Sequence, residues 1–235
     1  MQKPVAIITG AGRGIGRAAA GELARRHYQL VLLARSVDEL EETKKLCGGG
    51  LVLPVDVTDA AAVDRVIQTA FAEFGAIDAI VHCAGIAPVK SIADMSVAEW
   101  HAVIDTNLSA AFYLCKSAWP IFAKQGSGVV VNVSSVSARD PFAGFSAYGA
   151  SKAGLNLFGL SAAREGSKIG VRVHTIAPGA VETGMFRKIL TPEQYPAEKT
   201  LRPADVAQTI AQCVTGELRF TSGEVIYLQR DIGDN

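Results

Sequence analysis

Residues 5–16 read V-A-I-I-T-G-A-G-R-G-I-G, a short apolar run followed by a glycine-rich turn and the start of a helix-forming segment. Apolar residues in direct succession are typical of a strand that is buried on both faces of a parallel sheet. The turn lacks a strict G-x-G-x-x-G because position 15 is Ile15; its spacing is G-x-x-x-G-x-G at Gly10, Gly14 and Gly16. Glycines at these positions allow a tight turn and a close backbone approach to a pyrophosphate at a helix N-terminus. We therefore predict a strand–turn–helix unit that binds a dinucleotide.

The rest of the chain repeats this alternation of short apolar strands and longer helical segments. Strands are expected at 5–9, 30–34, 51–55, 77–82, 129–133, 171–176 and 224–228. Strand–helix alternation implies right-handed crossovers and a parallel sheet that is covered on both sides. We predict one α/β domain over residues 1–235: a doubly wound, Rossmann-type parallel sheet of about seven strands with helices on both faces.

The composition excludes several classes of partner. The 235 residues carry 23 Lys and Arg against 23 Asp and Glu, so no net field attracts nucleic acid or an anionic membrane. No apolar run approaches the roughly 18 residues of a membrane span, and the N-terminus does not resemble a signal peptide. The cysteines lack C-x-x-C pairing and the histidines lack ligand spacing. We expect a cytoplasmic protein with reduced thiols, without a metal site.

A second informative group follows the fifth predicted strand. Tyr148 and Lys152 are four residues apart, so on a helix they share one face. An ammonium beside a phenol favours the phenolate and is expected to lower the pKa of Tyr148, while the Ser135 hydroxyl can hold the same substrate oxygen. Tyr195 and Lys199 repeat the spacing, but a proline follows that tyrosine and no strand with a serine precedes it. We interpret this second pair as a chance match.

The end of the second predicted strand indicates which dinucleotide binds. An NAD site is expected to have a carboxylate about 20 residues after the glycines, for the ribose 2′-hydroxyl. Ala34 and Arg35 occupy that region, and the first acid is Asp38. A guanidinium suits a 2′-phosphate, and Arg13 in the glycine turn can face the same group. The pattern favours NADP over NAD.

Over its whole length the chain resembles the short-chain dehydrogenase/reductase family in its single-domain form. The quoted glycine turn resembles that family's cofactor loop, and Ser135, Tyr148 and Lys152 match its catalytic set. The resemblance adds Asn107, in I-D-T-N-L, as a catalytic residue that helps to position Lys152 and a water. It also implies an adenine-side segment in L-P-V-D-V-T-D and a nicotinamide-side segment in P-G-x-x-x-T. The implied cofactor-binding residues are Gly10, Arg13, Gly14, Ile15, Gly16, Arg35, Asp56, Val57, Ala84, Gly85, Tyr148, Lys152, Pro178, Gly179, Val181 and Thr183.

One segment departs from the family pattern. After the fourth predicted strand the family usually has N-N-A-G, whereas this chain has His82, Cys83, Ala84 and Gly85. The Ala-Gly turn is retained, so a close approach of the cofactor is still expected. His82 either supplies one of the missing polar contacts or is a structural histidine, and we assign it no catalytic role.

The function expected from this resemblance is NADP(H)-dependent reduction of a ketone to an alcohol, with a 3-oxoacyl or small carbonyl substrate. An NAD-dependent alcohol dehydrogenase and a non-catalytic NADP-binding sensor or scaffold are the alternatives. A short lid is expected at about 184–202, and a homodimer or homotetramer is implied by the family. Basic side chains of the lid either attract an acidic substrate or are simply solvated, and the second interpretation is favoured: Arg187, Lys188, Lys199 and Arg202. Six residues either line an apolar pocket or pack in the core: Pro141, Phe142, Phe145, Met185, Phe186 and Ile189.

Overall fold

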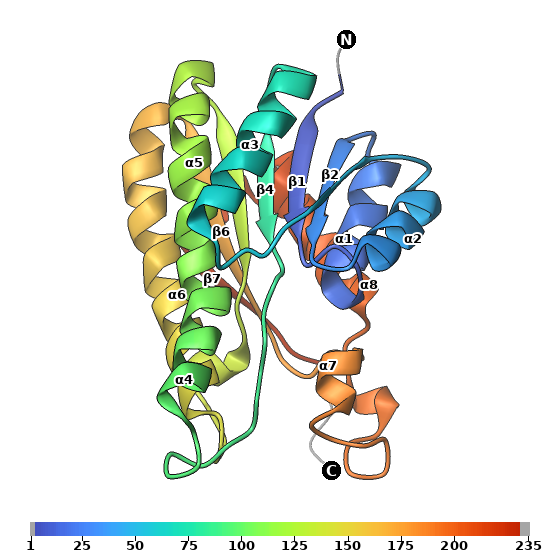
Figure 1. The fold of residues 1–235 in the computed structure, drawn as a ribbon, viewed down its shortest axis with the longest axis vertical. Coiled ribbons are helices and arrows are strands. Elements are labelled where there is room, and N and C mark those ends of the chain that lie inside the picture. Colours follow the sequence, from blue (N-terminus) through green and yellow to red (C-terminus); the bar gives the residue numbers. More distant parts are fainter. Residues whose placement is uncertain (1–2, 231–235) are drawn as a thin grey trace.

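Seven parallel strands form one sheet in the computed structural model, which describes residues 3–230 (Figure 1). Their order across the sheet is β3-β2-β1-β4-β5-β6-β7, so the direction of winding reverses between β1 and β4. Ligands bind beside such a reversal, at the carboxyl ends of the strands. The strands are β1 (Val5–Thr9), β2 (Gln29–Ala34), β3 (Leu51–Pro54), β4 (Ala79–His82), β5 (Gly128–Val133), β6 (Val171–Pro178) and β7 (Val225–Leu228).

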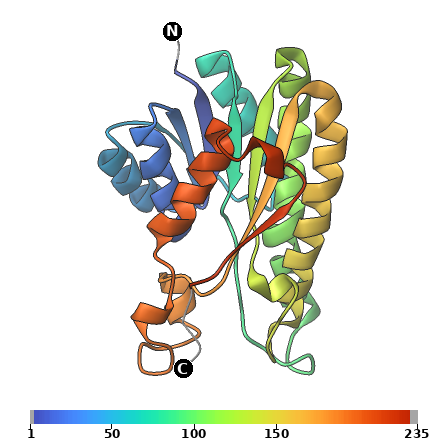
Figure 2. The same ribbon diagram turned by 180° about the vertical axis from the view of Figure 1, so that it is seen from behind.

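Helices cover both faces of this sheet, as Figures 1 and 2 show from opposite sides. One face is packed by α1 (Gly14–Arg25), α2 (Val37–Cys47) and α8 (Pro203–Thr215). The other is packed by α3 (Ala60–Phe74), α5 (Ala110–Gln125) and α6 (Ser146–Gly166). Each helix buries one apolar stripe, and the central strands β1, β4 and β5 are buried throughout, whereas the edge strands β3 and β7 are only partly buried. The predicted doubly wound, Rossmann-type α/β domain is confirmed.

Two strand boundaries differ clearly from the sequence prediction, at the start of β4 and at the end of β6. The fourth strand was expected from residue 77 but begins at Ala79. The side-chain amide of Gln125 accepts from the N–H of Ile77 at 3.0 Å and donates to its carbonyl at 2.8 Å. Ile77 is therefore held by α5 and not by a neighbouring strand. The sixth strand was expected to end at residue 176, but β6 extends to Pro178 because residues 175–178 pair with β7.

The helical region before α5 is interrupted by a π-helical segment. Ser96 caps α4 (Val97–Ile104) in a capping box with Glu99. The chain then forms a π-helix over Asp105–Ser109 before α5 begins. Such wide turns are rare and are frequent at functional sites, and this one contains Asn107.

The segment after β6 lies beneath the carboxyl ends of the strands (Figure 1). It contains the short helix α7 (Gly184–Arg187) and a 3₁₀ turn over Ala197–Lys199. A parallel bridge between Val181 and Leu201 closes the segment at its base. Within residues 3–230, no helix is long and apolar enough to cross a membrane.

Candidate active site

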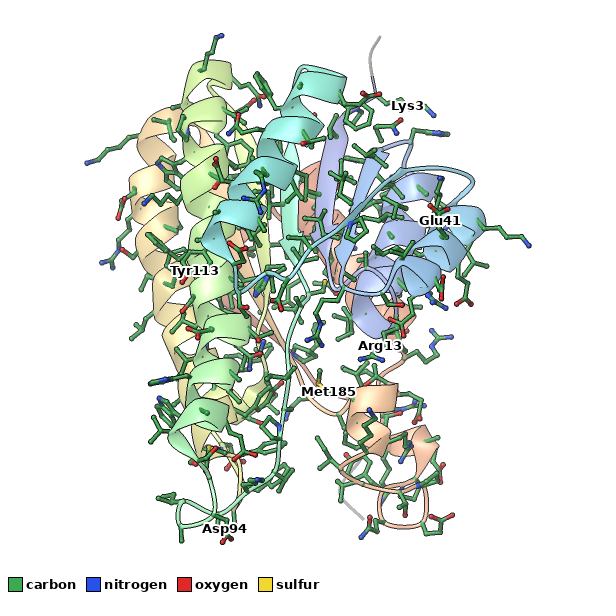
Figure 3. The ribbon with its side chains drawn as sticks, in the orientation of Figure 1. Lys3, Arg13, Glu41, Asp94, Tyr113 and Met185 are labelled. Carbon is green, nitrogen blue, oxygen red and sulfur yellow. The ribbon has the colours of Figure 1, made fainter. Side chains whose placement is uncertain are left out.

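A cavity of about 360 Å³ lies at the carboxyl ends of the strands, between the start of α6 and the segment that carries α7. The predicted catalytic residues Ser135, Tyr148 and Lys152 all line it. Figure 3 shows Arg13 at the start of α1 and Met185 on α7, both at this end of the sheet. The wall also contains Ile15, Cys83, Gly85, Ala87, Val133, Ser134, Val136, Ser137, Asp140, Phe142, Phe145, Pro178, Gly179, Ala180, Val181, Thr183, Phe186, Ile189, Leu190 and Tyr195.

Tyr148 and Lys152 lie on the first two turns of α6, and Ser135 follows β5 directly. The Lys152 amine is buried and donates to the carbonyl of Val133 at 2.8 Å. Its Nζ lies 5.7 Å from the centre of the Tyr148 ring. Ser135 caps a 3₁₀ turn by accepting from the N–H of Ser137 at 3.1 Å. The end of β5 thus positions both the serine and the lysine around one tyrosine.

The expected lowering of the Tyr148 pKa by Lys152 is not found in this arrangement. Burial raises the pKa of Tyr148 above its usual range, and hydrogen bonding with the Ser135 side chain opposes this shift. The amine is directed to the Val133 carbonyl, and burial lowers the pKa of Lys152 to about 8. Burial of the phenol therefore raises its pKa, and the expectation of a lowered pKa for Tyr148 was wrong.

Asn107 connects the π-helical segment to the turn after β4. Its Oδ1 accepts from the N–H of Ile86 at 2.9 Å, and its Nδ2 donates to the Ile86 carbonyl at 3.0 Å. The same Nδ2 also lies 3.0 Å from the Oγ of Ser151, on α6. A Cβ added to Gly85 would lie 3.2 Å from the Asn107 Oδ1 and 3.6 Å from the Lys152 Nζ. Asn107 does not line the cavity, but it fixes the backbone that does.

Thr9 and His82 hold the other side of that turn. The Thr9 Oγ1 accepts from the N–H groups of Cys83 and Ala84, both at 3.2 Å, and lies 3.0 Å from the His82 Nδ1. Because these two N–H groups occupy both lone pairs of the hydroxyl oxygen, the hydroxyl donates its proton to Nδ1, which places the imidazole proton on Nε2. Burial lowers the pKa of His82 to about 3, so the ring is neutral. His82 is absent from the cavity wall, which favours the structural role over a cofactor contact.

The glycine turn has the shape that a pyrophosphate requires. Gly10 and Gly14 have φ of +62° and +56°, which favour glycine. A Cβ on Gly10 would lie 2.9 Å from the N atom of Ala84, and one on Gly16 would lie 2.2 Å from the Gly10 carbonyl oxygen. Arg13 precedes α1 without a side-chain cap, so the first N–H groups of this helix can bind a phosphate. The predicted dinucleotide loop therefore fits such a ligand.

Two residues that the sequence did not single out support the glycine turn from α1 and α2. Arg17 donates to the Gly12 carbonyl and, at 3.1 Å, to the Thr43 hydroxyl. Thr43 in turn donates to the Ala11 carbonyl at 2.9 Å. Thr43 is fully buried on α2. A polar residue at a buried position of that helix was the sequence signal that could have identified it.

The residues expected at the adenosine end lie outside the cavity. Arg13 is 73% exposed and pairs with Glu39 at 3.4 Å. Arg35, after β2, is exposed and forms no hydrogen bond or ion pair within the described part of the chain. Asp56, after β3, accepts from the backbone and hydroxyl of Thr58, and these bonds lower its pKa. The next residue, Val57, is buried against the core.

The segment after β6 brings Thr183 to the glycine turn. Its methyl group lies 3.4 Å from a Cβ added to Gly14. Its hydroxyl donates to the Val181 carbonyl and accepts from the N–H of Phe186, both at 3.2 Å. Pro178, Gly179, Val181 and Thr183 all line the cavity.

Five of the six residues proposed for an apolar pocket line the cavity, and Pro141 does not. None of the four basic lid residues lines it. Tyr195, from the pair interpreted as chance, is part of the wall, and its hydroxyl contacts the Lys199 carbonyl at 3.5 Å. Tyr195 therefore belongs to the cavity wall, whereas Lys199 does not line the cavity. Among residues 3–230, no group of three or more His, Cys, Asp or Glu is arranged to hold a metal.

Comparison with known proteins places this chain in a family. The model of the short chain dehydrogenase family matches residues 4–194. The 3-oxoacyl-[acyl-carrier-protein] reductase FabG of Salmonella typhimurium is 33% identical over 231 residues, covering 95% of both chains. FabG of Vibrio cholerae is 32% identical over 235 residues, covering 97% of this chain and 96% of that protein. The crystal structure of levodione reductase is similar with a TM-score of 0.92, 26% identity and 98% coverage of both chains. The chain belongs to the short-chain dehydrogenase/reductase family and is an oxidoreductase.

Proposed function

We propose that this oxidoreductase uses NADP(H) to reduce a ketone to an alcohol, with proton transfer at Tyr148. The observation that carries the proposal is the convergence of three groups on one cavity. The Ser135 and Tyr148 side chains and the Lys152 amine border it together, beside the turn that Asn107 holds.

Each of these residues has a distinct task in the proposed reaction. When bound, the nicotinamide supplies the hydride. Ser135 and Tyr148 hydrogen-bond the substrate oxygen, and Tyr148 donates the proton to it. Because burial raises the pKa of Tyr148 above its usual value, its phenol keeps the proton that reduction requires. Lys152, in its charged form, orients the ribose.

The preference for NADP over NAD rests on the charges at the adenosine end. The end of β2 carries Arg35 in place of a carboxylate, and that guanidinium is exposed and unpaired among residues 3–230. Arg13 lies at the start of α1, where it can exchange its 3.4 Å contact with Glu39 for a 2′-phosphate. A guanidinium can form two parallel hydrogen bonds with a phosphate group. NAD has a hydroxyl in place of the 2′-phosphate, so it cannot form this contact.

The relatives support a carbonyl substrate. Two of them are named as 3-oxoacyl-[acyl-carrier-protein] reductases and one as levodione reductase. A homodimer or homotetramer and a cytoplasmic location, both expected from the sequence, remain proposals. Exposed apolar side chains on α5 and α6, Phe112 at 47% and Leu157 at 70%, support self-association.

The direct experiment is NADPH oxidation by the purified protein with a panel of ketones and diketones. The proposal expects turnover with at least one neutral ketone, and a higher kcat/KM with NADPH than with NADH. Tight NADPH binding without turnover of any ketone would contradict the proposed reaction. An equal or better kcat/KM with NADH would contradict the cofactor preference alone.

A further inference from the structure

We infer that the cavity selects uncharged ketones that carry a planar ring beside the carbonyl group, and that Asp140 disfavours anionic substrates. The inference rests on the proposed reduction at Tyr148. It narrows the substrate to a class that the motifs do not specify. Three features of the wall support it: one row of stacked rings, a second aromatic pair opposite, and the distribution of charge.

The first feature is a row of rings that leads from the surface to Tyr148. The Phe142 and Phe145 rings are stacked, with centroids 4.0 Å apart and planes inclined by 29°. Phe145 lies 5.0 Å from the Tyr148 ring. Phe145 is only 5% exposed, whereas Phe142 is 51% exposed. The outer ring therefore keeps free surface on which a flat substrate ring can stack.

The second feature is the opposite wall. The loop before α6 and the helix α7 lie on opposite sides of the space beneath the strand ends in Figures 1 and 2. From the α7 side, Phe186 and Tyr195 form an edge-on pair with centroids 5.5 Å apart. Met185, Ile189 and Leu190 complete this apolar side. Aromatic and aliphatic groups on both sides favour a flat apolar body over a polar one.

The third feature is that the wall offers an acid but no free cation. Lys152 and Asp140 are the charged members of the wall among the described residues. The Lys152 amine is directed to the Val133 carbonyl. The Asp140 carboxylate has no hydrogen bond or ion pair among residues 3–230, whereas its backbone N–H bonds to Val136. A substrate anion would therefore meet an exposed carboxylate without an ion-pair partner near the rim, and like charges repel.

Two nearby arginines are directed to other partners. Arg139, the residue before Asp140, lies over the Tyr227 ring at 4.1 Å. Arg187 is 17% exposed and donates to Glu182 and to the carbonyls of Leu190 and Tyr195. Neither arginine lines the cavity. Neither arginine is therefore placed to pair with the carboxylate of an anionic ketone, which would lose water of hydration on entering the cavity.

The test compares three 2-oxo compounds that differ in one property at a time. Ethyl benzoylformate and ethyl 2-oxooctanoate are both neutral esters, with a phenyl and a hexyl group of six carbons each. Benzoylformate keeps the phenyl ring but is an anion. We expect kcat/KM for the phenyl ester to exceed that for the hexyl ester by about fivefold.

Two variants assign the preferences to the residues. Phe142→Leu should reduce the ratio of kcat/KM for the phenyl ester to that for the hexyl ester toward one. Phe220 is an exposed phenylalanine outside the wall, so Phe220→Leu is the control and should leave this ratio unchanged. Asp140→Asn should raise kcat/KM for benzoylformate relative to its ethyl ester by about fivefold. Asp64→Asn makes the same change of net charge on α3, outside the wall, and should leave that ratio unchanged.

A binding measurement keeps this test independent of turnover. Calorimetric titration of ethyl mandelate and ethyl 2-hydroxyoctanoate into the enzyme should give tighter binding of the ring compound. Equal or weaker binding of that compound, or an unchanged phenyl-to-hexyl ratio in Phe142→Leu, would overturn the ring preference. An unchanged anion-to-ester ratio in Asp140→Asn would overturn the role of Asp140. Failure of all ketones to be reduced, with the ring preference in binding intact, would instead refute the proposed reaction.

Discussion

At the residue scale, Arg35 determines the proposed choice between the two dinucleotides. Its guanidinium is exposed and forms no hydrogen bond or ion pair among the described residues, so no direct contact has to be broken when a phosphate binds. We predict that Arg35→Asp lowers kcat/KM for NADPH by about tenfold or more, because a bidentate charged contact is replaced by repulsion. The value for NADH should not fall.

Steady-state kinetics with both cofactors checks this prediction. Arg65→Asp, which changes an exposed arginine on α3, serves as the control and should alter neither value. An unchanged NADPH preference in Arg35→Asp would show that Arg35 does not contact the 2′-phosphate.

His82 should make stability dependent on pH. Its pKa is about 3 in the folded protein and about 6.5 in an unfolded chain, so between these values only the unfolded chain binds the proton. Stability is therefore lost as the pH falls below about 6.5. The slope for one such proton is ~1.4 kcal/mol per pH unit.

We predict that His82→Asn removes this contribution and flattens the fall in unfolding free energy between pH 6 and pH 4.5. Urea denaturation across this range measures the slope. Burial also lowers the pKa of His174 to about 4. Its contribution to the pH dependence of stability is the same in both proteins, so it cancels when their slopes are compared. Parallel slopes for the two proteins would contradict the assignment of a neutral, buried His82.

The sequence predicted some site residues and missed others for a physical reason. The sequence spacing after one predicted strand was enough to select Ser135, Tyr148 and Lys152. Thr9 and Asp140 could not, because their roles depend on contacts between strands and on the path of a loop. The pKa of Tyr148 was also mispredicted, since burial cannot be read from the spacing of a tyrosine and a lysine.

At the element scale, the segment 184–202 is held over the cavity by a small polar network. Glu182 pairs with Arg187 and accepts from the Thr200 hydroxyl at 3.2 Å. Arg187 also donates to the Tyr195 carbonyl at 2.7 Å. The network joins the start, middle and end of the segment that we predict to act as a lid.

We predict that Glu182→Gln loosens this segment. The expected results are about threefold faster tryptic cleavage within it and a severalfold higher KM for the ketone, because local opening becomes easier. Glu198→Gln changes an exposed glutamate of the same segment that is outside the network, and it is the control. Cleavage at the wild-type rate in Glu182→Gln would show that this network does not hold the lid.

Most strands and helices could be predicted because apolar runs and helical periodicity follow directly from burial on two faces. The π-helical segment at Asp105–Ser109 could not, since its wide turn depends on the hydrogen bonds that Asn107 makes with Ile86. The start of β4 was also misplaced, because the Gln125 side chain takes the hydrogen bonds of Ile77.

At the scale of the whole molecule, one face leaves apolar side chains in solvent. Trp100, Phe112 and Leu157 are 39%, 47% and 70% exposed on α4, α5 and α6. We predict a solution mass of two or four times 24.7 kDa, measured by light scattering. Leu157→Glu should shift the mass toward the monomer, whereas Leu46→Glu, 68% exposed on α2, should not. A monomeric wild type would contradict this prediction.

We propose that the whole fold delivers a ketone to Tyr148 for proton transfer beside bound NADP(H). Single-turnover NADPH oxidation by wild type and Tyr148→Phe with the same ketone, together with NADPH affinity by fluorescence titration, tests this proposal. We expect a loss of at least about 10³-fold in rate, with NADPH affinity within a few fold of wild type. Oxidation of NADPH by Tyr148→Phe at a rate near that of wild type would contradict it.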